Sequence, residues 1–197
     1  MIGFPSVMGF SFNGLAASAA LRTPLFRQLL GTIGVIDASP SSAKRALDNN
    51  RTIGISTGGV AEVFETNNKD QVIVLKSRKG IIKLAFKHGA DLVPCYLFGN
   101  TELLSLWTGG SWHDFFCNLS RKIGFATIIF WGRFGLPVPY RIPIVGVMAE
   151  PIPVPKNENP TDEELDVLHK LLMDRMVELF EKYKHSYGWG DKKLIII

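Results

Sequence analysis

Short apolar, β-branched runs alternate with helical patterns along this chain, and that alternation limits the folds open to it. Residues 72–75 (VIVL) and 91–98 (DLVPCYLF) are typical of strands in their length and side chains. Between them, the stretch from residue 78 has the apolar periodicity of a helix, and Gly89 follows as a helix-ending residue. Strands separated by helical segments favour an α/β sheet with buried strands.

The N-terminal third continues this alternation. The expected elements are helices at residues 24–30 and 41–47 and strands at residues 34–37 and 51–57. Ser39 is expected to cap the second helix, with Pro40 at its first position. We therefore predict an α/β fold for residues 1–197, a single domain with a mixed, mostly parallel buried sheet that is flanked by helices.

The C-terminal segment PTDEELDVLHKLLMDRMVELFEKYK has the most regular helical pattern of the chain. Thr161 and Glu164 have the spacing of a capping box at its start. Apolar side chains share one face of this helix: Leu165, Leu168, Leu172, Met176, Leu179 and Phe180. The remaining positions look solvent-facing, and His169 and His185 are expected there.

Composition excludes several classes of protein. With 46% hydrophobic residues among 197, the chain can bury a sizeable core, and a net charge of +4 is too small for a nucleic-acid-binding coat. Cys95 and Cys117 lie in apolar or aromatic runs, which fits a reducing compartment better than a disulfide framework. We expect no metal site, because no ligand spacing for a metal is present.

The first 21 residues carry no charge. The AASAA sequence at residues 16–20 is similar to a signal-peptide cleavage region, but a basic segment before it is missing. Glycines and Pro5 interrupt the apolar run, so a membrane-spanning helix fits poorly. We expect residues 1–21 to be buried or membrane-facing, and any membrane contact to be at the surface.

Basic residues gather on the helix that starts near residue 78. On a helical wheel, Lys79, Lys83 and Lys87 share one arc, whereas Arg78 points with the apolar side chains. The lysine stripe fits either a solvated face or, together with the aromatic residues of segment 100–140, one membrane-facing surface. Bases near a helix N-terminus cost roughly 0.3–1 kcal/mol each, so we expect an internal carboxylate or a bound phosphate to compensate them.

The sequence STGGVAE supplies one such carboxylate. Gly58 and Gly59 follow an expected strand and allow close approach of the backbone, and Glu62 comes within reach of that turn. The spacing by itself also fits an ordinary strand-to-helix turn. We predict that a buried Arg78 pairs with Glu62, because an arginine at a positive helix end needs a carboxylate and Glu62 is the nearest acid of the motifs.

Three blocks, GGVAE at 58–62, SRKGIIKLAFKHGADLVPCYLFGN at 77–100 and VMAEPIPVPKNENPT at 147–161, resemble the type-2 diacylglycerol acyltransferase family. The resemblance implies a glycerolipid-acyltransferase-like fold. It also implies transfer of a fatty acyl group from acyl-CoA, a substrate and not a cofactor, to an acylglycerol or a fatty alcohol. With diacylglycerol as acceptor the product is triacylglycerol. The implied location is the cytosolic face of the endoplasmic reticulum membrane and lipid droplets, in contact with membrane lipid.

The family's motifs correspond to particular residues of this chain. Those implied to bind acyl-CoA or the acceptor are Gly58, Gly59, Glu62, Arg78 and Gly80. The family's HPHG motif, which supplies the expected general base, is absent from these 197 residues, so we expect an N-terminally incomplete part of such an enzyme with little activity alone. His88 lies in a motif block, but a histidine beside a helix-ending glycine is more typical of a structural role, and no catalytic residue is assigned.

Two alternatives to an acyltransferase remain open at this point. A non-catalytic module that binds lipid or acyl-CoA would share the membrane contact and lack turnover. A nucleotide-binding α/β domain is less well supported, because GGVAE lacks the lysine and the third glycine of a phosphate-binding loop.

Overall fold

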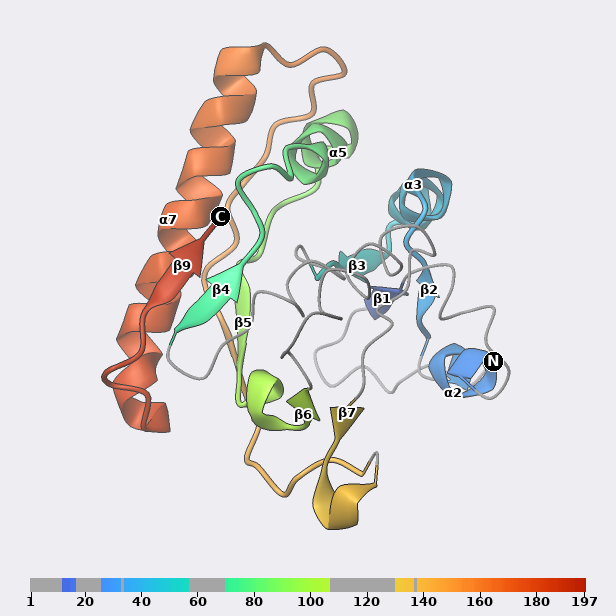
Figure 1. Ribbon diagram of the computed structural model, residues 1–197. Helices are drawn as coiled ribbons and strands as arrows, with labels where there is room; N and C mark the ends of the chain where they lie inside the picture. The colour runs from blue at the N-terminus through green and yellow to red at the C-terminus, as the bar shows by residue number, and fades with distance from the viewer. Residues whose placement is uncertain (1–11, 17–25, 33, 57–69, 107–129, 137) are drawn as a thin grey trace, which may run out of the picture.

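The computed structural model describes residues 12–16, 26–32, 34–56, 70–106, 130–136 and 138–197. In this part of the chain, helices and strands are mixed, which confirms the α/β class. Figure 1 shows the long C-terminal helix α7 with β4, β5 and β9 on one side, and α2 and α3 with β1 to β3 on the other. Gly58, Gly59 and Glu62 lie outside the described residues.

The elements are short apart from α7. In the first half they are β1 (Phe12–Ala16), α2 (Phe26–Thr32), β2 (Ile36–Asp37), α3 (Pro40–Asp48), β3 (Thr52–Gly54), β4 (Gln71–Ile73) and α5 (Gly80–His88). In the second half they are β5 (Cys95–Phe98), η1 (Asn100–Glu102), β6 (Ser105–Leu106), β7 (Phe130–Trp131), η2 (Arg133–Gly135), β8 (Val145–Met148), α7 (Asp162–Tyr187) and β9 (Leu194–Ile196).

Within the described residues, the strands form several small sheets and no single continuous one. β1 lies between β2 and β3 and is parallel to both, and β4 is parallel to β9. β5 and β8 are antiparallel, as are β6 and β7. The expected strand 91–98 is shortened to β5 because Pro94 has no N–H to give to a ladder, and only a bridge between Leu92 and Ile152 precedes it.

The helix signals read from the sequence are confirmed at their ends. Ser39 caps α3 through its side chain, which accepts a hydrogen bond from the backbone N–H of Ser42. Thr161 and Glu164 form both hydrogen bonds of the capping box of α7. Gly89 ends α5 with a left-handed φ of 61°, a conformation that glycine adopts without steric cost.

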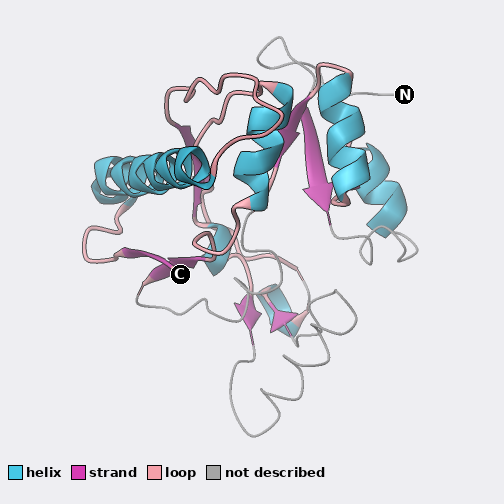
Figure 2. Cartoon of the chain, turned by 90° about the horizontal axis from the view of Figure 1, so that it is seen from above, coloured by secondary structure: helices cyan, strands magenta, loops and turns pink. Residues whose placement is uncertain are grey.

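The core lies between α7, α5 and the β5–β8 ribbon. The buried apolar side chains of α7 are those predicted from its periodicity, Leu165, Leu168, Leu172, Leu179 and Phe180, with Met176 partly buried beside them. Phe98 of β5 stacks on Phe180 and lies 5.5 Å from the ring centroid of Trp189. Seen from above in Figure 2, α5 lies between α7 and α3, and it contacts both helices.

The described part of the uncharged N-terminal segment is β1. It is the middle strand of its sheet, and Asn13 is buried there, with its side-chain amide donating to the carbonyl of Gly34 at 2.7 Å. None of the helices in the described ranges combines the length and apolarity needed to cross a bilayer.

Candidate functional site

The turn from β4 into α5 carries the second sequence motif. The backbone N–H of Arg78 donates to the carbonyl of Leu75 at 2.9 Å, which closes the turn. The N–H groups of Leu75 and Lys76 both donate to the carbonyl of Ile197, each at 2.9 Å. The entry to α5 is therefore held by Ile197, the residue after β9, a strand that was not predicted from the sequence.

His169 of α7 also holds this turn. Its Nε2 lies 3.0 Å from the carbonyl oxygen of Leu75, and only 3% of the residue is exposed. A carbonyl can only accept, so this ring nitrogen carries the proton in that hydrogen bond. The expectation of an exposed His169 was wrong, because the residue follows Leu165 by four positions and shares its buried face. His185 is exposed, as expected.

Arg78 is exposed, which contradicts its expected position among the apolar side chains. The reason is the helix boundary. α5 begins at Gly80, so Arg78 belongs to the preceding turn, where the geometry of a helical wheel does not apply. The predicted pair with Glu62 cannot be examined, since Glu62 lies outside the described residues.

A different carboxylate faces the start of α5. Asp166 of α7 forms an ion pair with Lys79, the residue that precedes the first turn of α5. Both side chains are about half exposed, so the pair contributes at most about 1 kcal/mol. α5 has no acidic residue in its first turn, and no described residue pairs with the Arg78 side chain. Among the described residues, the exposed guanidinium therefore lies beside a positive helix end that no acidic side chain of α5 offsets.

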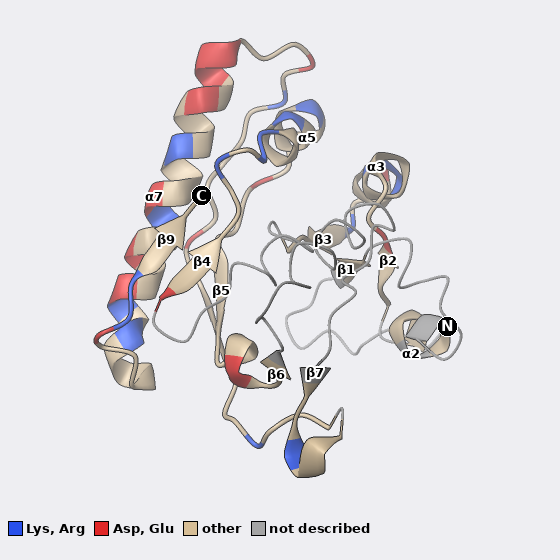
Figure 3. Cartoon of the chain, viewed as in Figure 1, with Lys and Arg blue, Asp and Glu red and all other residues tan. Residues whose placement is uncertain are grey.

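Gly80 and the remaining lysines complete this surface. A Cβ built on Gly80 would meet no atom within 4 Å, so packing does not require glycine at this position. Lys83 and Lys87 are exposed, like Lys79, as both the solvated and the membrane-facing interpretation of the stripe require. Figure 3 shows the basic residues along α5 and the acidic start of α7 beside it.

His88 lies at the other end of α5, about 12 Å from Gly80 at the rise of a helix. Its Nδ1 is 3.0 Å from the carbonyl oxygen of Leu84, and its Nε2 is 3.3 Å from a carboxylate oxygen of Asp48 in α3. Both ring nitrogens therefore face acceptors, and the histidine links α5 to α3. This geometry fits a structural role.

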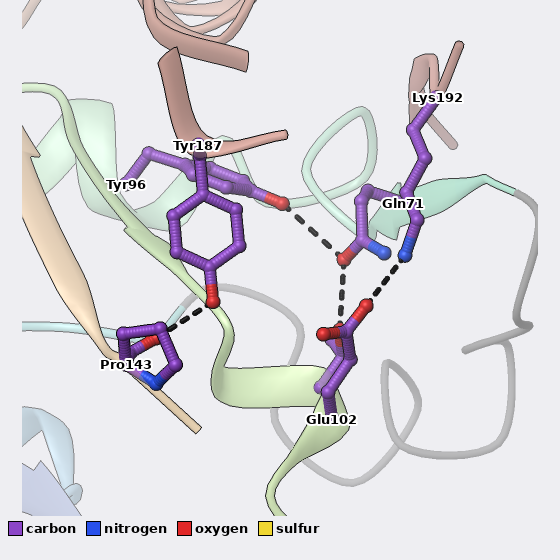
Figure 4. A network of polar contacts seen from close by, with 7 residues as sticks. Gln71, Tyr96, Glu102, Pro143, Tyr187 and Lys192 are labelled. Carbon is purple, nitrogen blue, oxygen red and sulfur yellow. Dashed lines mark hydrogen bonds and ion pairs between the residues drawn. The ribbon is translucent and has the colours of Figure 1, made fainter. Parts of the chain in front are cut away.

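A polar network closes the lower end of β4 and β5 (Figure 4). Gln71 is buried, and its Oε1 accepts hydrogen bonds from Tyr96 at 3.3 Å and Thr101 at 3.1 Å. Its Nε2 is buried with no acceptor among the described residues. Lys192 pairs with Glu102 at 2.8 Å, which ties the segment before β9 to η1.

Tyr187 joins the end of α7 to the same region. Its hydroxyl donates to the carbonyl of Pro143 at 2.6 Å. Burial, and to a lesser extent the charge of Glu102, raises the pKa of Tyr187 above its usual value. The phenol therefore stays protonated at neutral pH and remains a donor.

The thiol of Cys95 is not prepared for nucleophilic chemistry. Desolvation raises its pKa, so it is protonated at neutral pH, and it donates to the carbonyl of Val93. In the ranges that the structure describes, no group of histidine, cysteine or acidic side chains could hold a metal ion.

Residues 4–197 match the family model described as diacylglycerol acyltransferase. The chain is 37% identical to diacylglycerol O-acyltransferase 2 of Homo sapiens over 187 residues, which cover 88% of this chain and 48% of the relative. It is 36% identical to diacylglycerol O-acyltransferase 2 of Danio rerio, and the match covers 99% of this chain and 58% of the relative. It is 35% identical to 2-acylglycerol O-acyltransferase 3 of Homo sapiens, and the match covers 84% of this chain and 52% of the relative.

The chain spans about half the length of the curated relatives it matches. No solved structure matches it significantly. The Arg78 and Gly80 motif at the start of α5 lies inside the region that the family model covers. With nearly the whole sequence matched, the chain belongs to the diacylglycerol acyltransferase family.

Proposed function

We propose that this chain transfers a fatty acyl group from acyl-CoA to an acylglycerol, so that diacylglycerol becomes triacylglycerol. A fatty alcohol is the other acceptor that the motifs imply. The observation that carries this proposal is the family membership, together with relatives named for transfer to diacylglycerol and to 2-acylglycerol. Those names favour catalysis over a non-catalytic lipid-binding module.

Within this proposal, the start of α5 binds the phosphates of acyl-CoA. The exposed guanidinium of Arg78 can make paired hydrogen bonds to phosphate oxygens, and the helix end adds a positive dipole. Gly80 leaves room for the ligand. Gly58, Gly59 and Glu62 belong to the same proposed site on the strength of their motif.

The setting of the reaction is also a proposal. A substrate as apolar as diacylglycerol resides in a membrane, so the fold, of the glycerolipid-acyltransferase type, works against membrane lipid. The cytosolic face of the endoplasmic reticulum and lipid droplets are the expected locations. The lysine stripe stays a candidate for membrane contact, although Lys79 is already paired with Asp166.

The test is a single-turnover assay. The chain, in excess over radiolabelled oleoyl-CoA, is mixed with dioleoylglycerol in detergent micelles, and labelled triacylglycerol is measured. Excess protein is needed because no general base is assigned, and such a base contributes typically about 10²–10⁴-fold. Labelled product above that of an Arg78→Ala variant supports the proposal. Saturable acyl-CoA binding with no ester formed would favour the binding-module alternative for this chain.

Replacing Arg78 with lysine should weaken acyl-CoA binding about tenfold, although the charge is kept. A lysine cannot reproduce the planar, paired hydrogen bonds that a guanidinium gives to a phosphate. Isothermal titration with a non-hydrolysable acyl-CoA analogue measures the effect. The matched control is Arg175→Lys on the exposed face of α7, which should bind as the parent does. Equal affinities for the two variants would remove Arg78 from the site.

Replacing Gly80 with alanine should separate ligand binding from stability. Because a Cβ meets nothing within 4 Å, the fold should tolerate it and gain up to about 1 kcal/mol from reduced unfolded-state entropy. Binding of the same analogue should fall, since the methyl group occupies the approach to the helix end. Gly31→Ala in α2 is the control, as a Cβ there is equally free of contacts. Unchanged affinity in Gly80→Ala would argue against ligand contact at this glycine.

A further inference from the structure

The stretch from residue 115 to residue 149 contains no aspartate or glutamate. Its charged residues are all basic: Arg121, Lys122, Arg133 and Arg141. The rest is mostly apolar and aromatic. Such a composition favours anionic and apolar partners over cationic ones.

Between β7 and β8, the described part of this stretch includes a loop around η2, residues 132–136 and 138–141, called here the η2 loop. Figure 1 shows it at the lower end of the described structure, away from the core. Phe134 is 82% exposed and Leu136 is 55% exposed, and Val138 is exposed as well. Three large apolar side chains are thus presented together to solvent, although a soluble surface normally disperses them.

The backbone of the η2 loop is closed on itself. Gly132 donates to the carbonyl of Leu136 at 2.7 Å, and Arg133 donates to that of Val138 at 2.8 Å. Leu136 donates back to Arg133 at 3.2 Å, and Val138 donates to Leu136 at 2.7 Å. Leaving water is costly for unpaired N–H groups, so pairing these four donors within the loop lowers the cost of moving it into an apolar medium.

Phe134 adopts a left-handed backbone conformation with φ 63°, which is unfavourable for a residue with a Cβ. Burial of the ring does not compensate for this cost, because the ring is exposed. The guanidinium carbon of Arg133 lies 5.0 Å from the ring centroid. The loop is anchored at its base, where Tyr140 hydrogen-bonds to Ser105 through its side chain and to Leu103 through its backbone. An exposed aromatic ring held in a strained but anchored loop suggests a contact made outside the chain.

We propose that the η2 loop inserts into an anionic bilayer. Phe134, Leu136 and Val138 enter the boundary between headgroups and acyl chains, and Arg133 and Arg141 bind lipid phosphates at the rim. The absence of acidic residues selects an anionic lipid surface over a basic protein partner. This inference is independent of acyl transfer, because it concerns attachment alone.

The η2 loop and the lysine stripe are alternatives for membrane contact. Figures 1 and 3 place α5 and the η2 loop at opposite ends of the described structure. The lysines and this described part of the aromatic segment therefore do not form the one surface expected from the sequence. If the η2 loop inserts into a bilayer, Lys83 and Lys87 stay in water, away from the lipid surface.

Vesicle flotation tests the proposal with the full chain and phosphatidylcholine vesicles with or without phosphatidylserine. The main variant is Phe134→Gly, because glycine accepts the left-handed backbone and the fold is kept or stabilised. We expect binding to anionic vesicles to fall about tenfold or more, as one buried aromatic side chain is lost. Leu136→Ser should weaken it too, and Val167→Ser on the exposed face of α7 should not.

Two outcomes would overturn the proposal. In the first, Phe134→Gly floats as the parent does, whether or not Lys83→Glu with Lys87→Glu abolishes binding. In the second, Phe134→Gly converts a dimeric parent to a monomer in gel filtration, which assigns the loop to a second copy of this chain. The assay contains no acyl-CoA, so its result is separable from that of the transfer assay.

Discussion

Replacing Phe180 with alanine should lower the free energy of unfolding by about 3–5 kcal/mol. Phe180 is 0% exposed, stacks on Phe98 at 5.6 Å between ring centroids, and meets Tyr96 edge-on at 5.1 Å. Its loss would leave a cavity at the junction of α7 and the β5–β8 ribbon. Urea denaturation followed by tryptophan fluorescence should report the change, since Trp189 lies in the same cluster.

Val167→Ala provides the comparison for Phe180→Ala. Val167 lies on the same helix and is 71% exposed, so its truncation should change stability by no more than about 0.5 kcal/mol. If the two variants lost similar stability, α7 would not pack through Phe180, and the core described above would be wrong.

The second large effect is expected for Gly99→Ala, a loss of about 2–4 kcal/mol. Gly99 has φ 86°, which costs an alanine about 1–2 kcal/mol. Its Cβ would also lie 2.3 Å from the Tyr187 hydroxyl oxygen and 2.5 Å from the Pro143 carbonyl oxygen. These two atoms share the hydrogen bond that ties α7 to the segment before β8, and separating them costs roughly a further 1–2 kcal/mol.

Gly188→Ala is the control that separates the cost of the left-handed backbone from the cost of the steric contacts at Gly99. Gly188 has a similar φ of 93°, but a Cβ there meets nothing within 4 Å. It should therefore show only the conformational cost, and thermal unfolding of both variants gives the difference. Equal losses would mean that the contact between Gly99 and Tyr187 contributes nothing to stability.

Elements whose signals are local could be predicted from the sequence. Ser39 with Pro40, Thr161 with Glu164, and Gly89 each act on backbone groups within a few residues, so the ends of α3, α7 and α5 follow from nearby side chains. Burial along α7 followed from periodicity for the same reason. The start of α5 was less certain. It was expected near residue 78 but lies at Gly80, and this difference places Arg78 on the exposed surface and not among the apolar side chains.

The candidate site was less predictable because its contacts are distant in sequence. Asp166 pairs with Lys79 across 87 positions, and His169 reaches Leu75 across 94. Neither partner can be chosen from spacing, since many acids and carbonyls compete. One signal was present: the interval from Leu165 to His169 to Leu172 repeats the helical period and places the histidine on the buried face.

The pairing of β4 with β9 also affects how the chain can reach its folded state. Lys193 donates to Asp70 across 123 positions, and the Leu75 and Lys76 N–H groups depend on Ile197. During translation, β9 leaves the ribosome after every other element of this unit, so the turn that presents Arg78 can be completed only after α7 has been made. Contacts of such long sequence separation slow folding, and until they form, the edge of β4 is open to pairing with other chains.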